Sequence, residues 1–263
     1  MRRIIRTLAI AFASIVMLGF CAILYSFSRT VPLAKRQPLS GGAIQVKDGL
    51  VSAAIIPSGD RQVILVDCGN DSKANAILRE LDGMALKKES VKAILLTHDH
   101  PDHVAGCGVF PEAEIFAMAP ERPLLEGRVA AQSVFGFLMG KKNSGIRITR
   151  YLQDGESLAL GNLVVSAYLI PGHTAGSAAY VAAGTLYLGD SADAGKDGTL
   201  LRAKRFVSND IEENQNSLEA LADRLRPQAE QIKFMEFGHS GPLIGIGPLL
   251  DFAKSRNLKR TTE

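Results

Sequence analysis

Four potential metal ligands lie within the short segment Thr97-His98-Asp99-His100-Pro101-Asp102-His103. Imidazole nitrogens and carboxylate oxygens together suit zinc, iron or manganese, and zinc is the usual cation of hydrolytic sites built from such ligands. In a loop that leaves a strand, two histidines followed by an Asp-His pair can wrap around two adjacent cations. The segment therefore predicts a metal centre that activates water for hydrolysis.

The other two histidines of the chain lie in Gly-rich turns. His173 belongs to Pro171-Gly172-His173-Thr174, and His239 to Gly238-His239-Ser240-Gly241-Pro242. Glycine lets the backbone approach a crowded centre without a clash from Cβ. All 5 histidines of the chain are thus in contexts typical of ligands, whereas histidines with general surface or core roles would be scattered. We interpret them as one set.

Apolar runs place these polar residues at the ends of strands. Val63–Val66 is followed by Asp67, Val91–Leu96 by His98, 185–189 by Asp190, and 231–236 by the turn that holds His239. The ends of strands and the loops that follow them are where rigid scaffolds present functional groups. We therefore expect four strand ends to meet in one polar cluster.

The remaining pattern predicts the layers around this cluster. Ala43–Val46 and Val51–Pro57 flank the turn signal Lys47-Asp48-Gly49 and predict a hairpin. Further strands are expected at 157–160, 163–170 and 178–183, and helices at 72–86, 210–225 and 245–257. Two strand-rich halves, each closed by helices, predict an α/β (α+β) protein in which two sheets pack together with helices on their outer faces.

The motifs HxHxDH (98–103), PGHTAGS (171–177), LGD (188–190) and GHSGP (238–242), in this order, resemble the metallo-β-lactamase superfamily, and most closely its glyoxalase II-related branch. The resemblance covers about residues 43–255. It implies a four-layer αββα sandwich, a hydrolase, and a site at one edge of the two sheets that holds two divalent cations. Zinc is expected, with iron or manganese as alternatives.

The resemblance also implies a role for each ligand. The residues for the first cation are His98, His100 and His173, and those for the second are Asp102, His103 and His239. Asp190 would bridge the two cations, and Asp102 would also orient the nucleophile or relay a proton. Asp67 matches an aspartate that supports the ligands from behind, and Asp99 matches no ligand.

Asp190 also limits the class of reaction that the resemblance implies. Cysteine-liganded β-lactamases carry cysteine at this step, whereas a bridging aspartate is typical of thioesterases, lactonases and phosphoesterases of the superfamily. We expect a small ester, thioester or lactone as substrate. The alternatives are a single-iron sulfur dioxygenase-like enzyme and a β-lactam hydrolase. The residues after His239 are too few for the helical extension with which glyoxalase II holds glutathione, so glutathione thioesters are in doubt as the specific substrate.

The N-terminus is predicted to place the enzyme at a membrane. Arginines at 2, 3 and 6 precede an uncharged apolar run over residues 8–27, which is long enough to cross a bilayer as a helix. Basic residues on this flank favour a catalytic domain outside the cytoplasm. We expect a signal anchor or signal peptide at 1–30, a linker at 31–42 and the catalytic domain at 43–263. The alternative is secretion after cleavage of the signal.

Composition and cysteines limit the partners. The net charge of +3 comes from dispersed residues, so nothing indicates binding of nucleic acid, and the sequence gives no oligomeric state. Cys68 and Cys107 would pair in an oxidising compartment, but two unpaired buried thiols are the favoured interpretation.

The segment 119–150, with its apolar patch 134–140, is expected to form either a helix on the core or a wall of the substrate site. Residues 200–206 are expected to be either a second rim of the site or an exposed connection.

Overall fold

The computed structural model describes residues 24–133, 136, 140, 141 and 143–260, together with residues 14, 17, 19 and 21 of the N-terminal segment. The chain forms two compact units, Met1–Thr30 and Val31–Glu263. Unit 2 contains the two sheets and every residue of the predicted site.

The larger of the two main sheets holds seven strands in sequence order, β1-β2-β3-β4-β5-β6-β7. Its first four strands pair antiparallel, and β4 to β7 pair in parallel. The strands are β1 (Arg36–Pro38), β2 (Ile44–Asp48), β3 (Val51–Gly59), β4 (Gln62–Val66), β5 (Val91–Leu95), β6 (Glu114–Met118) and β7 (Arg150–Leu152).

The second sheet has six strands in the order β15-β14-β11-β10-β9-β8, and a two-stranded ribbon, β12-β13, lies apart from it. Only β11 and β14 run parallel in this sheet. The strands are β8 (Ser157–Leu160), β9 (Leu163–Leu169), β10 (Ala178–Ala182), β11 (Thr185–Tyr187), β12 (Ala192–Ala194), β13 (Leu200–Arg202), β14 (Phe234–Glu236) and β15 (Leu243–Ile244).

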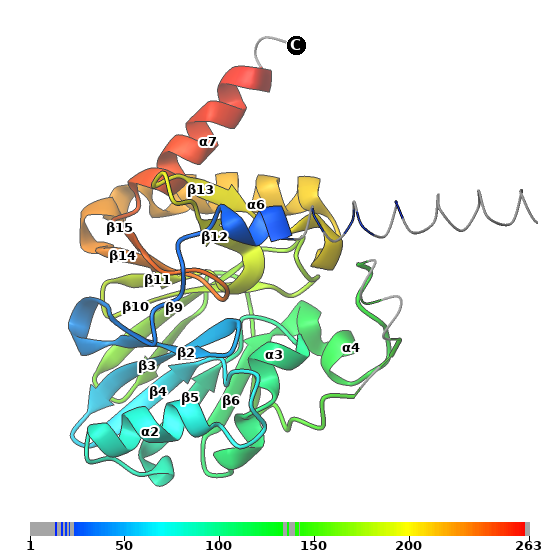
Figure 1. Cartoon of the computed structure of the whole chain (residues 1–263). Coiled ribbons are helices and arrows are strands. Elements are labelled where there is room, and N and C mark those ends of the chain that lie inside the picture. The colour runs from blue at the N-terminus through cyan, green and yellow to red at the C-terminus, as the bar shows by residue number, and fades with distance from the viewer. Residues whose placement is uncertain are drawn as a thin grey trace, which may run out of the picture. The chain divides into compact units, whose positions relative to one another are not determined.

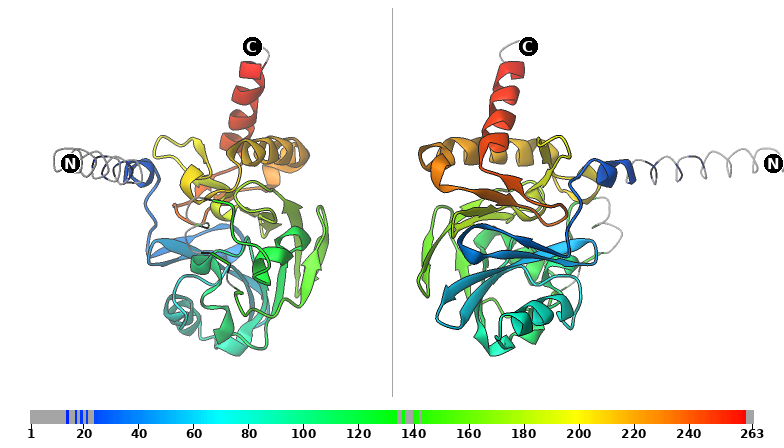
Figure 2. Two further views of the ribbon diagram at one scale, coloured as in Figure 1. Left: turned by 90° about the vertical axis from the view of Figure 1, so that its right-hand side faces the viewer. Right: turned by 60° about the vertical axis from the view of Figure 1, so that its left-hand side comes forward.

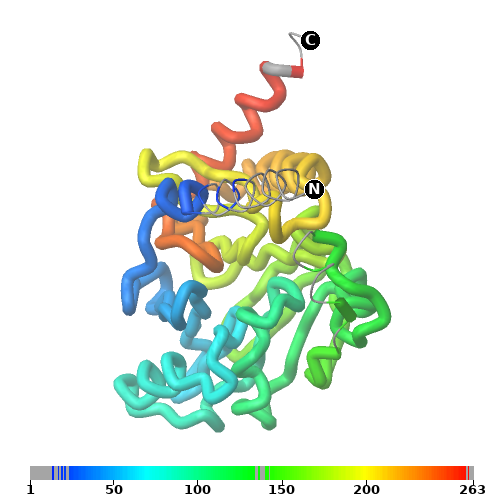
Figure 3. Tube along the Cα trace, turned by 45° about the vertical axis from the view of Figure 1, so that its right-hand side comes forward, coloured from blue at the N-terminus to red at the C-terminus, as the bar shows by residue number. Residues whose placement is uncertain are grey.

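The helices of unit 2 cover the outer faces of the two sheets (Figure 1). Among the described residues they include α2 (Asn75–Gly83), α3 (Pro101–Val104), α4 (Arg122–Leu125), α6 (Ile211–Leu225) and α7 (Gly247–Arg260). Helix α6 begins at a strong cap, because the carboxylate of Asp210 accepts hydrogen bonds from the backbone N–H groups of Glu212 and Glu213. Helix α7 follows the last strand and leads away from the rest of unit 2 (Figure 3).

Three apolar clusters define four layers. Successive residues of a strand face opposite sides, so Ile55 and Leu65 pack under α2, while Ile56 and Ile64 face the second sheet. There they meet a middle cluster that includes Tyr180 and Tyr187 of the second sheet. A third cluster joins the outer face of that sheet to α6 and α7. The predicted αββα sandwich is therefore confirmed (Figure 2).

Several short elements of the structure were not predicted from the sequence. The segment predicted as a linker, 31–42, contains β1, because Arg36–Pro38 finds a free edge beside β2. The strands β6 and β7 also went unpredicted, since β7 has only three residues and its partner β6 is distant in sequence. Local periodicity carries no signal for a strand this short.

Most of the predicted membrane segment, residues 8–27, lies outside the described residues. Within the part of the chain that the structure does describe, no helix combines the length and the apolar character needed to cross a bilayer.

Candidate metal centre

The predicted strand ends meet at one edge of the two sheets. Strand β4 leads to Asp67 and β5 to the loop of His98 and His100, while β11 and β14 of the second sheet lead to Asp190 and His239. Helix α3 contributes Asp102 and His103, and the connection from β9 to β10 carries His173. Figure 1 shows the two sheets stacked on each other.

Their side chains form two groups in which the potential ligand atoms all lie within 4.8 Å of one another. We call them the first half (His98, His100, His173 and Asp190) and the second half (Asp102, His103 and His239). The structure thus brings together all seven residues that the sequence predicted as ligands.

Three ring nitrogens converge in the first half. Nε2 of His173 lies 3.2 Å from Nε2 of His98 and 3.1 Å from Nδ1 of His100. Ligands of a tetrahedral zinc ion with bonds of about 2.0–2.1 Å stand about 3.4 Å apart. The spacing of the nitrogens is therefore close to that of ligands sharing one cation.

Hydrogen bonds at the back of the rings fix which nitrogen faces the cluster. The hydroxyl of Thr97 donates to Asp67, so it accepts from Nδ1–H of His98 at 3.0 Å. The hydroxyl of Ser208 donates to the backbone oxygen of Lys204, so it accepts from Nδ1–H of His173 at 2.9 Å. Both Nε2 atoms consequently carry lone pairs. Two lone pairs 3.2 Å apart repel each other, and a cation bound between them would remove this repulsion.

The second half is arranged around carboxylates. Nδ1 of His239 donates to the backbone oxygen of Leu50 at 2.7 Å, which turns Nε2 toward Asp102 Oδ2 at 3.3 Å and Asp190 Oδ2 at 3.0 Å. Nδ1 of His103 donates to Asp67 Oδ2 at 2.7 Å, which turns its Nε2 toward Asp190 Oδ1 at 3.1 Å. Each imidazole is oriented by an acceptor behind it, as is usual for metal-binding histidines.

Asp190 lies between the two halves. Its Oδ2 is 3.0 Å from Nε2 of His239 and 3.8 Å from Nε2 of His173. Its Oδ1 and Nε2 of His103 are both buried, and neither has a hydrogen-bond partner of suitable geometry although they lie 3.1 Å apart. Such unsatisfied buried atoms are costly unless something else coordinates them. The residues present therefore fit a divalent cation in each half.

The electrostatic environments of the halves differ. Burial, and after it the neighbouring imidazoles, holds the pKa of His98 and of His173 well below the ordinary value, and burial lowers the pKa of His100 to about 4. These rings are neutral at pH 7, the form that binds a metal. Against the effect of burial, Asp190 raises the pKa of His103, and it raises that of His239 to about 10. A cation in the second half would displace these protons.

Asp67 is hydrogen-bonded to residues of the cluster. It accepts hydrogen bonds from the backbone N–H of Thr97 at 2.8 Å, from the hydroxyl of Thr97 at 2.7 Å, and from His103. Its φ of 59° lies in the left-handed region, which aspartate tolerates better than most residues. One carboxylate thereby orients a ligand of each half.

Close packing explains one glycine of the second half. A Cβ at Gly238 would lie 2.3 Å from Oδ1 of Asp190 and 2.7 Å from Cε1 of His103. Only glycine leaves room there for the turn that carries His239.

Several supporting residues were not found from the sequence. Glu121, Ser208, Gln45 and Ser52 are buried and hydrogen-bonded to the segments that carry the ligands. Each is a single polar residue within an ordinary strand or loop pattern. What distinguishes each of these residues is its hydrogen-bond partner, and that partner lies far away in the sequence.

Two predicted rims of the site have different outcomes. In the apolar patch 134–140 only residues 136 and 140 are among the described ones, so the prediction of a wall or helix stays a prediction. Residues 200–206 are not an exposed connection, because Leu200–Arg202 forms β13 beside β12. Lys204 there makes a buried ion pair with Asp193.

Cys68 and Cys107 form a disulfide. The favoured interpretation from the sequence, two unpaired buried thiols, was therefore wrong. The pairing depends on α3 packing back onto the end of β4, where the N–H of Cys68 donates to the backbone oxygen of His103 at 2.7 Å. The disulfide links the strand end that carries Asp67 to the segment that follows His103.

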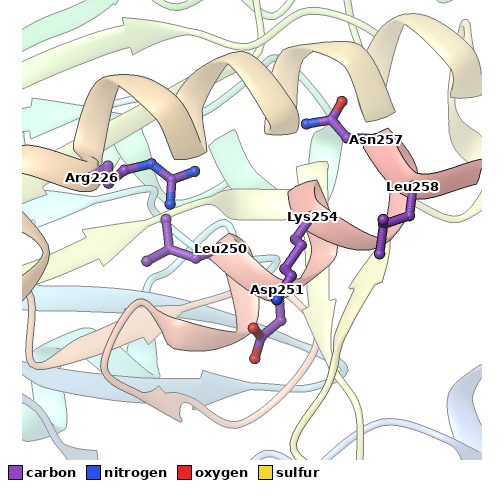
Figure 4. Close-up of a pocket in the computed structure, with 6 residues that line it drawn as sticks. All are labelled: Arg226, Leu250, Asp251, Lys254, Asn257 and Leu258. Atoms are coloured by element: carbon purple, nitrogen blue, oxygen red, sulfur yellow. The ribbon is translucent and has the colours of Figure 1, made fainter. Parts of the chain in front are cut away.

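A separate groove of about 370 Å³ lies between α6 and α7 (Figure 4). It is lined by Arg226, Leu250, Asp251, Lys254, Asn257 and Leu258. None of these side chains belongs to either half of the cluster, so the groove is distinct from the candidate centre.

An αββα sandwich with clustered histidines and aspartates at the edge of its sheets is suited to binding divalent metal ions. The family model described as "Metallo-beta-lactamase superfamily" matches residues 46–225. The chain belongs to this superfamily, which supports an enzyme of the metallo-hydrolase class, and its curated relatives are consistent with the glyoxalase II-related branch.

Two relatives illustrate the likeness in sequence. The probable metallo-hydrolase YybB of Bacillus subtilis is 32% identical over 177 residues, which are 65% of this chain and 74% of that protein. A hydroxyacylglutathione hydrolase of Pectobacterium atrosepticum is 35% identical over 128 residues, 49% of this chain and 41% of that protein. The chain thus spans less than half the length of this hydroxyacylglutathione hydrolase.

Solved structures show the same fold. A B3 metallo-β-lactamase with an active-site glutamic acid has a TM-score of 0.64 at 20% identity, covering 90% of this chain and 93% of that one. The metallo-β-lactamase MIM-1 from Novosphingobium pentaromativorans has a TM-score of 0.61 at 19% identity, covering 89% and 90%.

Proposed function

We propose that the protein is a dinuclear metal-dependent hydrolase of small esters, thioesters or lactones. The observation that carries the proposal is the convergence of the three ring nitrogens of the first half beside Asp190, whose Oδ1 lies 3.1 Å from Nε2 of His103 in the second half. The mixed imidazole and carboxylate ligands favour zinc. When bound, two such cations lower the pKa of water and polarise the oxygen of the scissile carbonyl group.

The residues of the chain have separable tasks in this proposal. Asp190 holds the halves at a fixed separation, and the neutral rings of His98 and His173 provide ligands without first losing a proton. Asp102 is the most accessible carboxylate of the centre, with 34% of its side chain exposed against 7% for Asp190. We assign to Asp102, besides ligation, the orientation of the nucleophile and the acceptance of its proton on the solvent side.

Metal analysis combined with a substrate panel tests the proposal. We expect two equivalents of zinc per chain, and turnover of thioesters, lactones or simple esters that ends when a chelator removes the metal. The panel should also contain a phosphodiester and a chromogenic β-lactam. One equivalent of iron with consumption of oxygen would instead establish a sulfur dioxygenase-like enzyme. Preferential turnover of the β-lactam would establish a lactamase.

We further propose that the catalytic domain works outside the cytoplasm, tethered by the apolar segment 8–27. The disulfide between Cys68 and Cys107 supports this location, because such bonds persist mainly in oxidising compartments. Secretion after cleavage is the alternative.

A fusion experiment tests the location. Alkaline phosphatase, which is active only after export, is joined to the C-terminus and expressed in a bacterial host. We expect activity in the membrane fraction for the full chain and none for a chain without residues 1–30. Activity released into the soluble exported fraction would indicate cleavage, and an inactive full-length fusion would contradict export.

A further inference from the structure

We propose that Glu121 and Gln45 are positioning residues that each support a different half of the metal centre, so that the two halves can be weakened separately. This inference rests on the proposed dinuclear function. It concerns two buried side chains that do not themselves face the ligand atoms.

Glu121 joins the two loops of the first half. It follows β6 and has 1% of its surface exposed. Its Oε1 accepts from the backbone N–H of Asp99 at 2.8 Å, between His98 and His100. Its Oε2 accepts from the hydroxyl of Thr174 at 2.9 Å and from the N–H of Gly176 at 2.8 Å, directly after His173. One carboxylate therefore sets the distance between the loops whose nitrogens converge.

Gln45 has the corresponding place beneath the second half. It lies on β2 and is fully buried. Its amide Nε2 is 3.0 Å from the backbone oxygen of Phe237 and 2.9 Å from that of Ser240, the residues on either side of Gly238-His239. It is also 2.9 Å from Oε1 of Glu236. The amide group thereby holds both ends of the turn that presents His239.

The hairpin of β2 and β3 completes this support. The N–H of Ser52 donates to the backbone oxygen of Gly238 at 2.8 Å. The hydroxyl of Ser52 lies 2.9 Å from the backbone oxygen of Phe237. Leu50, at the tip of the hairpin, accepts from Nδ1 of His239 at 2.7 Å. The position of His239 thus depends on the first sheet, although the residue itself follows a strand of the second.

The two sets of contacts are separate. The residues that form hydrogen bonds with the side chain of Glu121 are all different from those that form hydrogen bonds with the side chain of Gln45. Glu121 acts on the segments 98–100 and 173–176, and Gln45 on 236–240. Loss of either should therefore reduce the metal affinity of one half, whereas a general loss of stability would reduce both.

Cobalt titration of the full chain in detergent separates these outcomes. The absorption of bound Co²⁺ is followed for the wild type, for Glu121→Gln and for Gln45→Met, which are close to the native side chains in size. His173→Ala and His239→Ala provide the reference spectra for loss of the first and of the second half. Thermal unfolding is recorded for every variant.

We expect Glu121→Gln to weaken, about 10–100-fold, the Co²⁺ signal that His173→Ala lacks. We expect Gln45→Met to weaken by a similar factor the signal that His239→Ala lacks, and excess Co²⁺ to restore both. If a variant does not fold, Thr174→Val and Ser52→Ala replace it, since each removes one hydroxyl from the same set of contacts.

Two failures are distinguishable. A wild type that takes up fewer than two equivalents of Co²⁺ overturns the dinuclear function. A wild type that takes up two, with variants that weaken both halves alike, the same half, or neither, overturns only the separate support by Glu121 and Gln45.

Discussion

Replacement of His100 with alanine is expected to lower hydrolysis at least about 100-fold while leaving the protein folded. Loss of a residue that only supports a metal ligand typically costs 10–100-fold in affinity or activity, and His100 is proposed to be a ligand itself. Its Nδ1 lies 3.1 Å from Nε2 of His173. Its ring is only partly buried, at the start of α3, so we expect a change in the free energy of unfolding of no more than about 1 kcal/mol.

Initial rates, metal content and circular dichroism of the purified variant check this expectation. Asp99→Asn is the matched control on the same loop, because the side chain of Asp99 matches no ligand and the substitution keeps its size. It should retain activity within a few-fold of the wild type. A His100→Ala variant with full activity would exclude the proposed centre as the site of reaction.

Removal of the disulfide has the largest expected effect on stability. The cystine closes a loop with a sequence separation of 39 residues, and cross-links of this span stabilise a protein by about 3–4 kcal/mol, mainly by restricting the unfolded chain. The double variant Cys68→Ala/Cys107→Ala is expected to unfold at a correspondingly lower urea concentration. Alanine is chosen because both cysteines are buried.

Urea titrations with and without a reducing agent measure the effect. The reductant should destabilise the wild type and leave the double variant unchanged. Cys21→Ala serves as the control, since Cys21 is an exposed free cysteine in the N-terminal segment. Equal midpoints for the wild type and the double variant would show that the bond contributes nothing to stability.

The ligands were predictable because their signals are local. His98, His100 and His103 lie within one short segment of the sequence, and the apolar runs before Asp190 and His239 indicate the ends of strands. The layers followed from the same runs, since strands buried on both faces read as continuous apolar segments.

The supporting residues were not predictable because they act across the fold. Gln45 is 191 positions before Glu236 in the chain, and Glu121 is 55 before Gly176. The disulfide was misjudged for the same reason, since only the packing of α3 onto the end of β4 brings its cysteines together. Strand β1 was missed because a three-residue edge strand depends on its neighbour rather than on its own sequence.

The position of the cluster between two sheets has a consequence for the order of folding. His98 follows a strand of the first sheet, and Asp190 and His239 follow strands of the second. Contacts so distant in sequence form late, because the chain must close long loops before it gains them. A cation bound by residues of both sheets favours the assembled state over every earlier one. If the centre binds metal as proposed, we therefore expect metal uptake to complete folding and to stabilise the assembled domain.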